Sequence, residues 1–346
     1  MKSTQAASIA IIITFVFAIL TLGKDLIIPM VLAIFIWYLI NILADSIAML
    51  KIGKFTPPRF LCFLLAMFVI FGSLIVFTNL ISTSINNVIK TAPSYQANVE
   101  SLLERGADLM GLDESPQLAE LVRKIDFTKI IQGLGLTVAG FIGSAGIILI
   151  YTLFIFLEQK CFLPKIDNMV GGGQQRDKVR SIMRRIYSDT KTYIGIKTLT
   201  SLLTGFVSYF IMRSIGLDFA VFWALLIFLF NYIPTIGSIV ATVFPSILAL
   251  VQFPTLTPFF IVVIGVTATQ MVVGNIIEPR LMGNTLNLSP LVILLALALW
   301  GSIWGIPGAI LCVPITVLMM IIFSNFQATR PIAILLSKNG EIRPDS

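Results

Sequence analysis

The sequence predicts an all-α polytopic membrane protein with about six full spans plus two broken or re-entrant helical hairpins, about eight transmembrane segments by hydropathy. Of the 346 residues, 57% are apolar and only 12% are charged, whereas soluble domains carry about 25% charged residues. Apolar runs that can cross a hydrocarbon core of about 30 Å recur along most of the chain. Lipid is therefore the expected solvent of this protein.

Ordinary spans account for most of the apolar sequence. We expect them at residues 6–23, 26–50, 60–81, 136–157, 193–213 and 258–277. Two further apolar stretches, 219–252 and 289–326, are much longer than one span requires. They flank the last ordinary span and need a different explanation.

Lysine and arginine in the connecting segments predict the orientation, because positive charge near membrane ends stays in the cytoplasm. The segment 51–59 has three basic residues and no acid, and the segment 159–197 has nine basic residues. We expect both of these segments in the cytoplasm.

The segment 82–135 carries seven acidic against five basic residues, so we expect it on the outer side. Pro93, Gly111 and Pro116 should divide it into short amphipathic helices. The C-terminal tail is basic and is expected in the cytoplasm together with the N-terminus. The predicted location is the bacterial inner (cell) membrane, as a multi-pass protein.

The first long stretch is interrupted near its middle by polar residues, a proline and a glycine. These residues are Asn231, Tyr232, Pro234, Thr235 and Gly237. Proline lacks an amide donor and clashes with the preceding turn, while glycine tolerates unusual dihedral angles, so the helix should break here. Each half is then too short to span a bilayer.

The second long stretch repeats this pattern at Gly301, Gly305 and Pro307. Non-helical backbone at membrane depth is tolerated only where protein covers it or water reaches it. Two broken apolar segments in corresponding places indicate a transport site. We expect re-entrant hairpins, the first entering from outside and the second from inside. The alternative is that Pro234 and Pro307 kink two long tilted spans.

A charged segment closes the span at 258–277. It contains Asn275, Glu278, Pro279 and Arg280. Ionisable groups at membrane depth are costly, which makes them candidates for function. If Glu278 lies instead at the cytoplasmic interface, it only pairs with Arg280 or with a neighbouring helix.

These assignments divide the chain into consecutive parts. They are N-terminal transmembrane helices at 1–81, an extracytoplasmic amphipathic helical segment at 82–135, transmembrane helices at 136–213 with a basic cytoplasmic loop at 159–192, a transport core at 214–327, and a cytoplasmic tail at 328–346. The basic stretch 174–191 has apolar residues at helical spacing and is expected to dock on anionic headgroups.

Composition excludes several kinds of chemistry. Histidine is absent, which removes the HExxH zinc site, the Ser/His pair and an imidazole proton relay. Cys62, Cys161 and Cys312 are far apart and are expected to pack rather than to bind metal. We therefore expect no metal, no cofactor and no enzymatic activity, and no nucleic acid among the partners.

Three segments together resemble one known family. They are Asn231–Gly237, Asn275–Gly283 and Gly301–Pro314, and the resemblance to the autoinducer-2 exporter (AI-2E) family of bacterial permeases extends over residues 219–336. The resemblance implies a permease for a small solute, with members linked to export of the quorum-sensing signal autoinducer-2 and others to sodium/proton antiport. It also places Pro234, Gly237, Asn275, Glu278, Pro279 and Arg280 in the transport core.

The leading prediction is a permease that exports a small polar solute, autoinducer-2 above others, driven by the gradient of the solute or by coupled ions. If Glu278 is buried, it is the candidate to carry a coupled proton. The alternative is a sodium (cation)/proton antiporter, which the scarcity of acids in the apolar segments disfavours. A non-transporting membrane scaffold would leave both helix breaks unexplained. The expected partners are membrane lipids and a small-molecule substrate or cation. Gly301 and Gly305 are spaced for close helix approach, which would allow a homo-oligomer.

Overall fold

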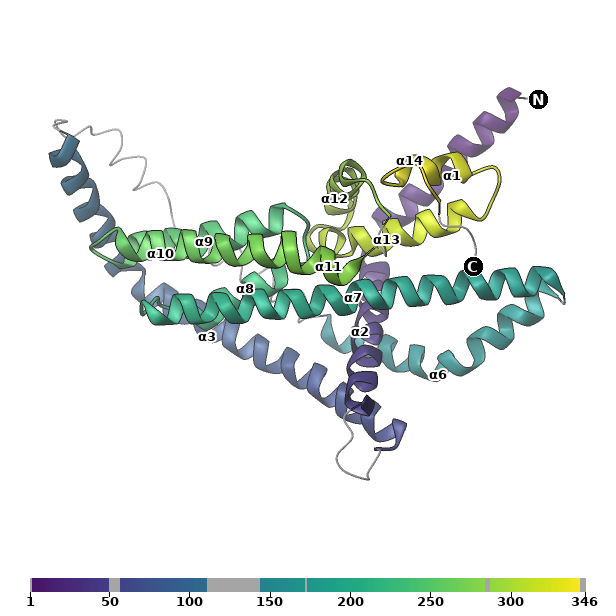
Figure 1. The fold of residues 1–346 in the computed structure, drawn as a ribbon, viewed down its shortest axis with the longest axis horizontal. Coiled ribbons are helices and arrows are strands. Elements are labelled where there is room, and N and C mark those ends of the chain that lie inside the picture. The colour runs from purple at the N-terminus through teal and green to yellow at the C-terminus, as the bar shows by residue number, and fades with distance from the viewer. Residues whose placement is uncertain (1, 50–56, 111–143, 172, 284–286, 343–346) are drawn as a thin grey trace. The chain divides into compact units, whose positions relative to one another are not determined.

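The computed structural model describes residues 2–49, 57–110, 144–171, 173–283 and 287–342, and this part of the chain is helical almost throughout and contains no β-strand (Figure 1). Within it, six helical segments are long and apolar enough to cross a membrane: Lys24–Met49, Arg59–Ser84, Ala145–Val170, Gln174–Ser214, Thr257–Met282 and Ile306–Ser324. The protein is therefore an all-α polytopic membrane protein, as predicted. The chain forms two compact units.

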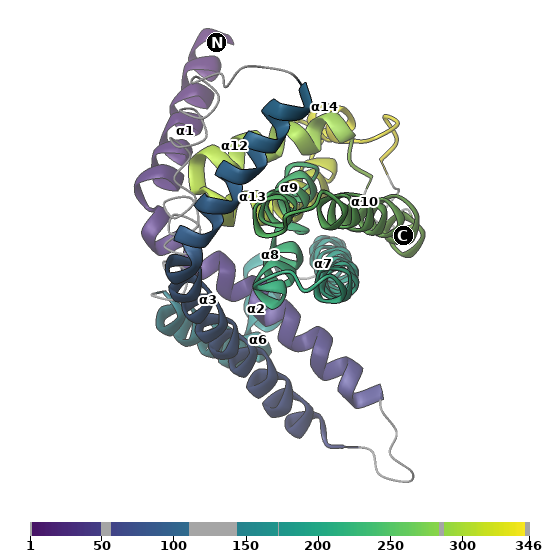
Figure 2. The same ribbon diagram turned by 90° about the vertical axis from the view of Figure 1, so that its left-hand side faces the viewer.

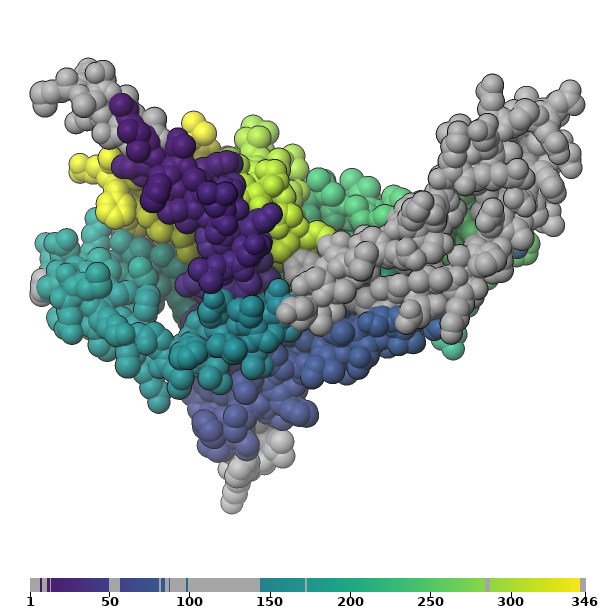
Figure 3. All heavy atoms as spheres, turned by 180° about the vertical axis from the view of Figure 1, so that it is seen from behind, coloured from purple at the N-terminus to yellow at the C-terminus, as the bar shows by residue number. Residues whose placement is uncertain are grey.

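The first unit comprises residues 1–68, 144–196 and 282–346. Helix α1 (Lys2–Leu22) and helix α2 (Lys24–Met49) are separated only by Gly23. Helix α6 (Ala145–Val170) packs against α2. Helices α1 and α6 lie on the face drawn in Figure 3. Both helices expose large apolar side chains, as lipid contact requires. Examples are Phe15 and Phe17 of α1 and Phe154 and Leu157 of α6.

The second predicted break lies in this unit, between helix α12 (Pro290–Trp304) and helix α13 (Ile306–Ser324). The only residue between them, Gly305, has a φ of +65°, which glycine adopts readily. The two helices pack against each other. Helix α14 (Arg330–Leu336) follows and packs on α13, and the Ser289 amide donates to the Leu336 carbonyl at 3.0 Å. The N-terminal end of α12 is thus hydrogen-bonded to the end of α14, which follows α13, so the two ends of the broken segment lie together as in a hairpin.

The second unit comprises residues 69–143 and 197–281. Its helices are α3 (Arg59–Met110) from Val69 onward, the end of α7 (Gln174–Ser214), α8 (Ala220–Phe230), α9 (Ile236–Gln252), α10 (Thr257–Val272), the π-helical turn η1 (Val273–Ile277) and α11 (Glu278–Met282). Figure 2 looks nearly along the axes of α7, α9 and α10, which lie together as a bundle with α8. Its core contains Met212, Phe222, Ile227, Val262 and Val266, each no more than 1% exposed.

Helices α8 and α10 run antiparallel to α7. The contacts at Asn231–Ser201 and, nearer the end of α7, between Ala224 and Gly205 fix the register of α8. A Cβ on Gly205 would lie 2.9 Å from the Ala224 carbonyl oxygen, so glycine permits this close approach.

The first break also forms a hairpin rather than a kinked span. The Gln252 side chain, at the end of α9, accepts from the Asp218 amide at 2.8 Å and donates to the Gly216 carbonyl at 3.0 Å. The end of α9 therefore returns to the connection that begins α8. A kinked span would put these two ends on opposite sides of the membrane, so the kink alternative is wrong for this segment.

Two sequence expectations need correction. Helix α3 (Arg59–Met110) runs without interruption through Pro93, which was expected to break the outer segment. Gly111 and Pro116 lie outside the described residues. Helix α7 extends the span predicted at 193–213 backward to Gln174, so the basic stretch 174–191 and the span are one continuous helix.

Candidate transport site

Four polar side chains within five residues of α7 contact candidate residues of the second unit. Lys197, Thr198, Thr200 and Ser201, which we call the polar hub, lie within the apolar part of α7. Thr200 and Ser201 are fully buried, and Lys197 is 8% exposed. Polar groups in such a position need partners within the protein.

Glu278 is the partner of Lys197. The Lys197 Nζ lies 2.8 Å from Oε1 and 2.9 Å from Oε2 of Glu278, and the Thr200 hydroxyl donates to Oε2 at 3.4 Å. The two charged side chains are only 10% and 16% exposed. Helices α8, α9 and α10 contain no charged residue, so this pair is isolated among apolar helices.

The tip of the first hairpin binds the same hub. The Asn231 Nδ2 donates to the Ser201 Oγ at 3.1 Å, and the Tyr232 hydroxyl donates to the Thr198 Oγ1 at 2.7 Å. At 1.5 Å per residue, Ser201 lies about 20 Å along α7 from Ser214. The tip therefore lies about 20 Å from the end of α7, which is two-thirds of the thickness of a hydrocarbon core of about 30 Å.

The sequence around Glu278 explains how that carboxylate reaches the hub. Pro279 cannot donate a backbone hydrogen bond, and its ring crowds the carbonyl four residues earlier. The helix responds with the π-helical turn η1, where the Glu278 amide donates to the Val273 carbonyl, five residues back. Such π-turns recur at functional sites because they rotate the following side chain out of the α-helical register.

Glycine closes the tip of the hairpin. An ideal Cβ on Gly237 would lie 1.8 Å from the Phe230 carbonyl oxygen, which ends α8. The same construction appears in the second hairpin, where a Cβ on Gly308 would lie 1.9 Å from the Trp300 carbonyl oxygen. Thr235, at the first tip, is exposed and has a φ of +59°, and Pro234 beside it is half-buried.

The remaining predicted residues lie away from the hub. Asn275, Pro279 and Arg280 are exposed, so of the two partners considered for Glu278 the structure shows the neighbouring helix and not Arg280. The residues of the second break belong to the other unit. There Gly301 is half-buried, Gly305 is exposed and Pro307 is buried at the start of α13.

The hub itself was not predicted from the sequence. Lys197 was counted with the basic cytoplasmic segment, although it lies inside the span predicted at 193–213. The signal was the spacing of Lys197, Thr200, Ser201, Thr204 and Ser208, which stand at i, i+3, i+4, i+7 and i+11 and so share one face of a helix. All five side chains are buried in the structure.

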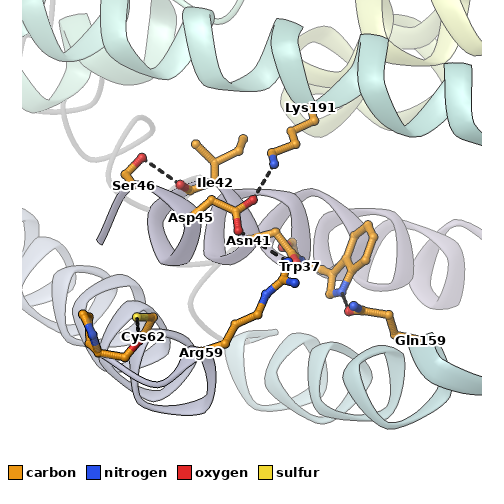
Figure 4. Close-up of polar contacts among 10 residues, drawn as sticks. Trp37, Asn41, Ile42, Asp45, Ser46, Arg59, Cys62, Gln159 and Lys191 are labelled. Atoms are coloured by element: carbon orange, nitrogen blue, oxygen red, sulfur yellow. Dashed lines mark hydrogen bonds and ion pairs between the residues drawn. The ribbon is translucent and has the colours of Figure 1, made fainter. Parts of the chain in front are cut away.

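A second polar cluster lies in the first unit (Figure 4). Asp45 of α2 contacts Lys191 of α7 at 2.5 Å and Arg59 of α3 at 3.6 Å, while the Trp37 indole donates to Gln159 of α6 at 2.9 Å. Asp45 and Lys191 are about a third exposed, unlike the pair in the hub. This cluster ties together the helices that meet at one end of α2.

The hub offers hydrogen-bond donors and acceptors and one buried ion pair. Among the described residues no three acidic, histidine or cysteine side chains are grouped to hold a metal ion. A multi-pass bundle with two broken hairpins, one of them docked on a buried polar and charged cluster, is the architecture of secondary transporters. The fold and the hub thus define a membrane transporter.

Comparison with known proteins identifies the family. The sequence profile of the "AI-2E family transporter" matches residues 8–328, and the chain belongs to this family. Its relatives are named as transport proteins and not as enzymes.

Two curated relatives illustrate the similarity. The "AI-2 transport protein TqsA" of Escherichia coli K12 is 30% identical over 319 residues, which cover 91% of this chain and 90% of the relative. A "Putative transport protein" of Haemophilus influenzae is 31% identical over 330 residues, covering 91% of both chains.

Proposed function

We propose that this protein exports a small polar solute, autoinducer-2 in the first instance, and that an ion gradient drives the export through Glu278. The observation that carries the proposal is the convergence of Glu278, Asn231 and Tyr232 on one buried stretch of α7. The name of the similar protein TqsA, an AI-2 transport protein, supports this solute.

The hub is closed in this structure, because each partner from the hairpin or from α11 is already hydrogen-bonded to α7. A solute that carries hydroxyl or carbonyl oxygens would replace the bonds of Asn231 and Tyr232 as the hairpin tip leaves α7. Both residues supply donors, and the hydroxyls of the hub supply donors and acceptors. Such a set of groups suits a polar solute better than an apolar one.

Coupling requires a group whose charge changes at this point. Protonation of Glu278 would neutralise it and weaken its bond to Lys197, because a charge-assisted pair is stronger than a neutral one. Thr200 touches Glu278 and lies between the positions that hold the hairpin tip, so the change reaches the hub directly.

We place the protein in the bacterial inner membrane with both termini in the cytoplasm and with the hairpins entering from opposite sides.

The test is efflux of autoinducer-2 from preloaded proteoliposomes, with and without an imposed proton gradient. We expect gradient-sensitive efflux from the unmodified protein and gradient-independent, slower efflux from Glu278→Gln. Lys191→Gln, which alters a lysine of α7 outside the hub, is the matched control and should behave as the unmodified protein. Efflux no faster than from empty vesicles would contradict the proposal.

The second candidate is cation/proton antiport, and the buried carboxylate of Glu278 is the observation that favours it. Vesicles loaded with sodium and assayed for proton release discriminate the two functions. Sodium-driven proton flux without solute efflux would favour the antiporter.

A further inference from the structure

The Lys197 ammonium group donates hydrogen bonds to both oxygens of the Glu278 carboxylate. The Lys197 Nζ is 2.8 and 2.9 Å from the two oxygens, and the Thr200 hydroxyl lies 3.4 Å from one of them. A free sodium ion bound by Glu278 would need these same oxygens, since sodium prefers several oxygen ligands. The position that a coupling cation would occupy therefore already holds a cation that belongs to the chain.

The surroundings make Lys197 the dominant charge at this carboxylate. Helices α8, α9 and α10 bring no charged side chain to Glu278. On its own helix, Arg280 is exposed, and it is not the partner of Glu278. No other described charged side chain is paired with Glu278.

A proton and a sodium ion differ sharply in what they need here. A proton binds one carboxylate oxygen and needs no further ligands. A sodium ion would need a shell of oxygen ligands and would sit within a few ångströms of an ammonium ion. Repulsion between like charges is strong where water is excluded.

We propose that Lys197 is a tethered cation that selects the proton over sodium as the coupling ion at Glu278. This inference rests on the proposed ion coupling through Glu278. It assigns to Lys197 a positioning and selectivity role, and it requires that removal of the ammonium open the carboxylate to sodium.

The test measures sodium binding without any solute. The thermal unfolding midpoint of the full-length protein in detergent is followed as sodium chloride replaces choline chloride at constant ionic strength. The variants are Lys197→Gln, Lys197→Gln combined with Glu278→Gln, and the control Lys191→Gln, which removes a lysine paired with Asp45 outside the hub.

We expect saturable sodium stabilisation in Lys197→Gln, with a half-saturating concentration at least tenfold below that of the unmodified protein. The double variant and Lys191→Gln should show no such response. A sodium response of the unmodified protein equal to that of Lys197→Gln overturns the proposal, as does a folded Lys197→Gln that ignores sodium.

A second measurement keeps the inference testable if Lys197→Gln does not fold. Proton-gradient-driven flux through the unmodified protein should be unchanged when potassium replaces sodium on both sides, and a dependence on sodium overturns the selection. Failure of autoinducer-2 efflux alone, with the sodium pattern as expected, would reject the proposed solute and leave the role of Lys197 standing.

Discussion

Removal of one member of the Lys197–Glu278 pair should destabilise the protein far more than removal of both. In Glu278→Gln an ammonium remains in a site where it is only 10% exposed, and in Lys197→Met a carboxylate remains that is 16% exposed. An uncompensated buried charge commonly costs about 3–5 kcal/mol. The double variant leaves neither charge, and its cost should be small because buried pairs are often replaceable by neutral side chains.

Proton exchange with solvent limits how much folding stability each single variant can lose. At pH 7, protonating an ordinary glutamate costs about 3.7 kcal/mol and deprotonating an ordinary lysine costs about 4.6 kcal/mol. Neither single variant should therefore lose more than about these amounts through the remaining charge.

The assay is equilibrium unfolding by sodium dodecyl sulfate in mixed micelles, with all four members of the double-mutant cycle measured at pH 7. We expect a coupling energy of about 2–4 kcal/mol between the two sites, because each single change exposes the full penalty of the other charge. A double variant whose loss equals the sum of the single losses would refute the reasoning. Single variants as stable as Lys191→Gln would refute it as well.

Three further predictions concern the first hairpin. Gly237→Ala should lose at least about 3 kcal/mol of stability or fail to fold, since its Cβ would lie 1.8 Å from a backbone oxygen, whereas Gly274→Ala, with open space around it, should be tolerated in the same unfolding assay. Tyr232→Phe removes one hydrogen bond to the hub and should cost about 1 kcal/mol, so undocking of the tip should become about fivefold more frequent, measured by amide hydrogen exchange. Cysteines placed at Ser214 and Pro254 should react with a membrane-impermeant reagent from the same side of sealed vesicles, and labelling from opposite sides would show that the hairpin crosses.

The hairpins were predictable because their interruptions combine several signals. Proline alone is a poor guide in this protein: Pro29, Pro164, Pro245 and Pro314 all lie inside continuous helices. Pro93 misled the prediction for the outer segment for the same reason, since a helix with intact turns on either side loses only one hydrogen bond. The two true breaks add glycine, and glycine is what lets the chain pass a carbonyl oxygen at each tip.

The partner of Glu278 was not predictable from local sequence. Counting basic residues assigns Lys197 to the cytoplasmic segment, because the count ignores which side of a helix a residue occupies. Its burial depends on the antiparallel register of α7 with α10, and contacts such as that of Gly265 with Ile211, where a Cβ would lie 3.0 Å away, set this register. Tertiary packing of this kind has no signature within a single segment.

The placement of the ion pair bears on the proposed coupling. A buried pair that touched no moving part would only add a folding cost, and apolar side chains would serve as well. In this protein, however, the stretch of α7 that holds Glu278 also holds the tip of the hairpin through Ser201 and Thr198, within little more than one helical turn. A change in the charge of Glu278 therefore acts on the same backbone that fixes the hairpin. This shared attachment gives the retained charges a purpose that stability alone does not supply.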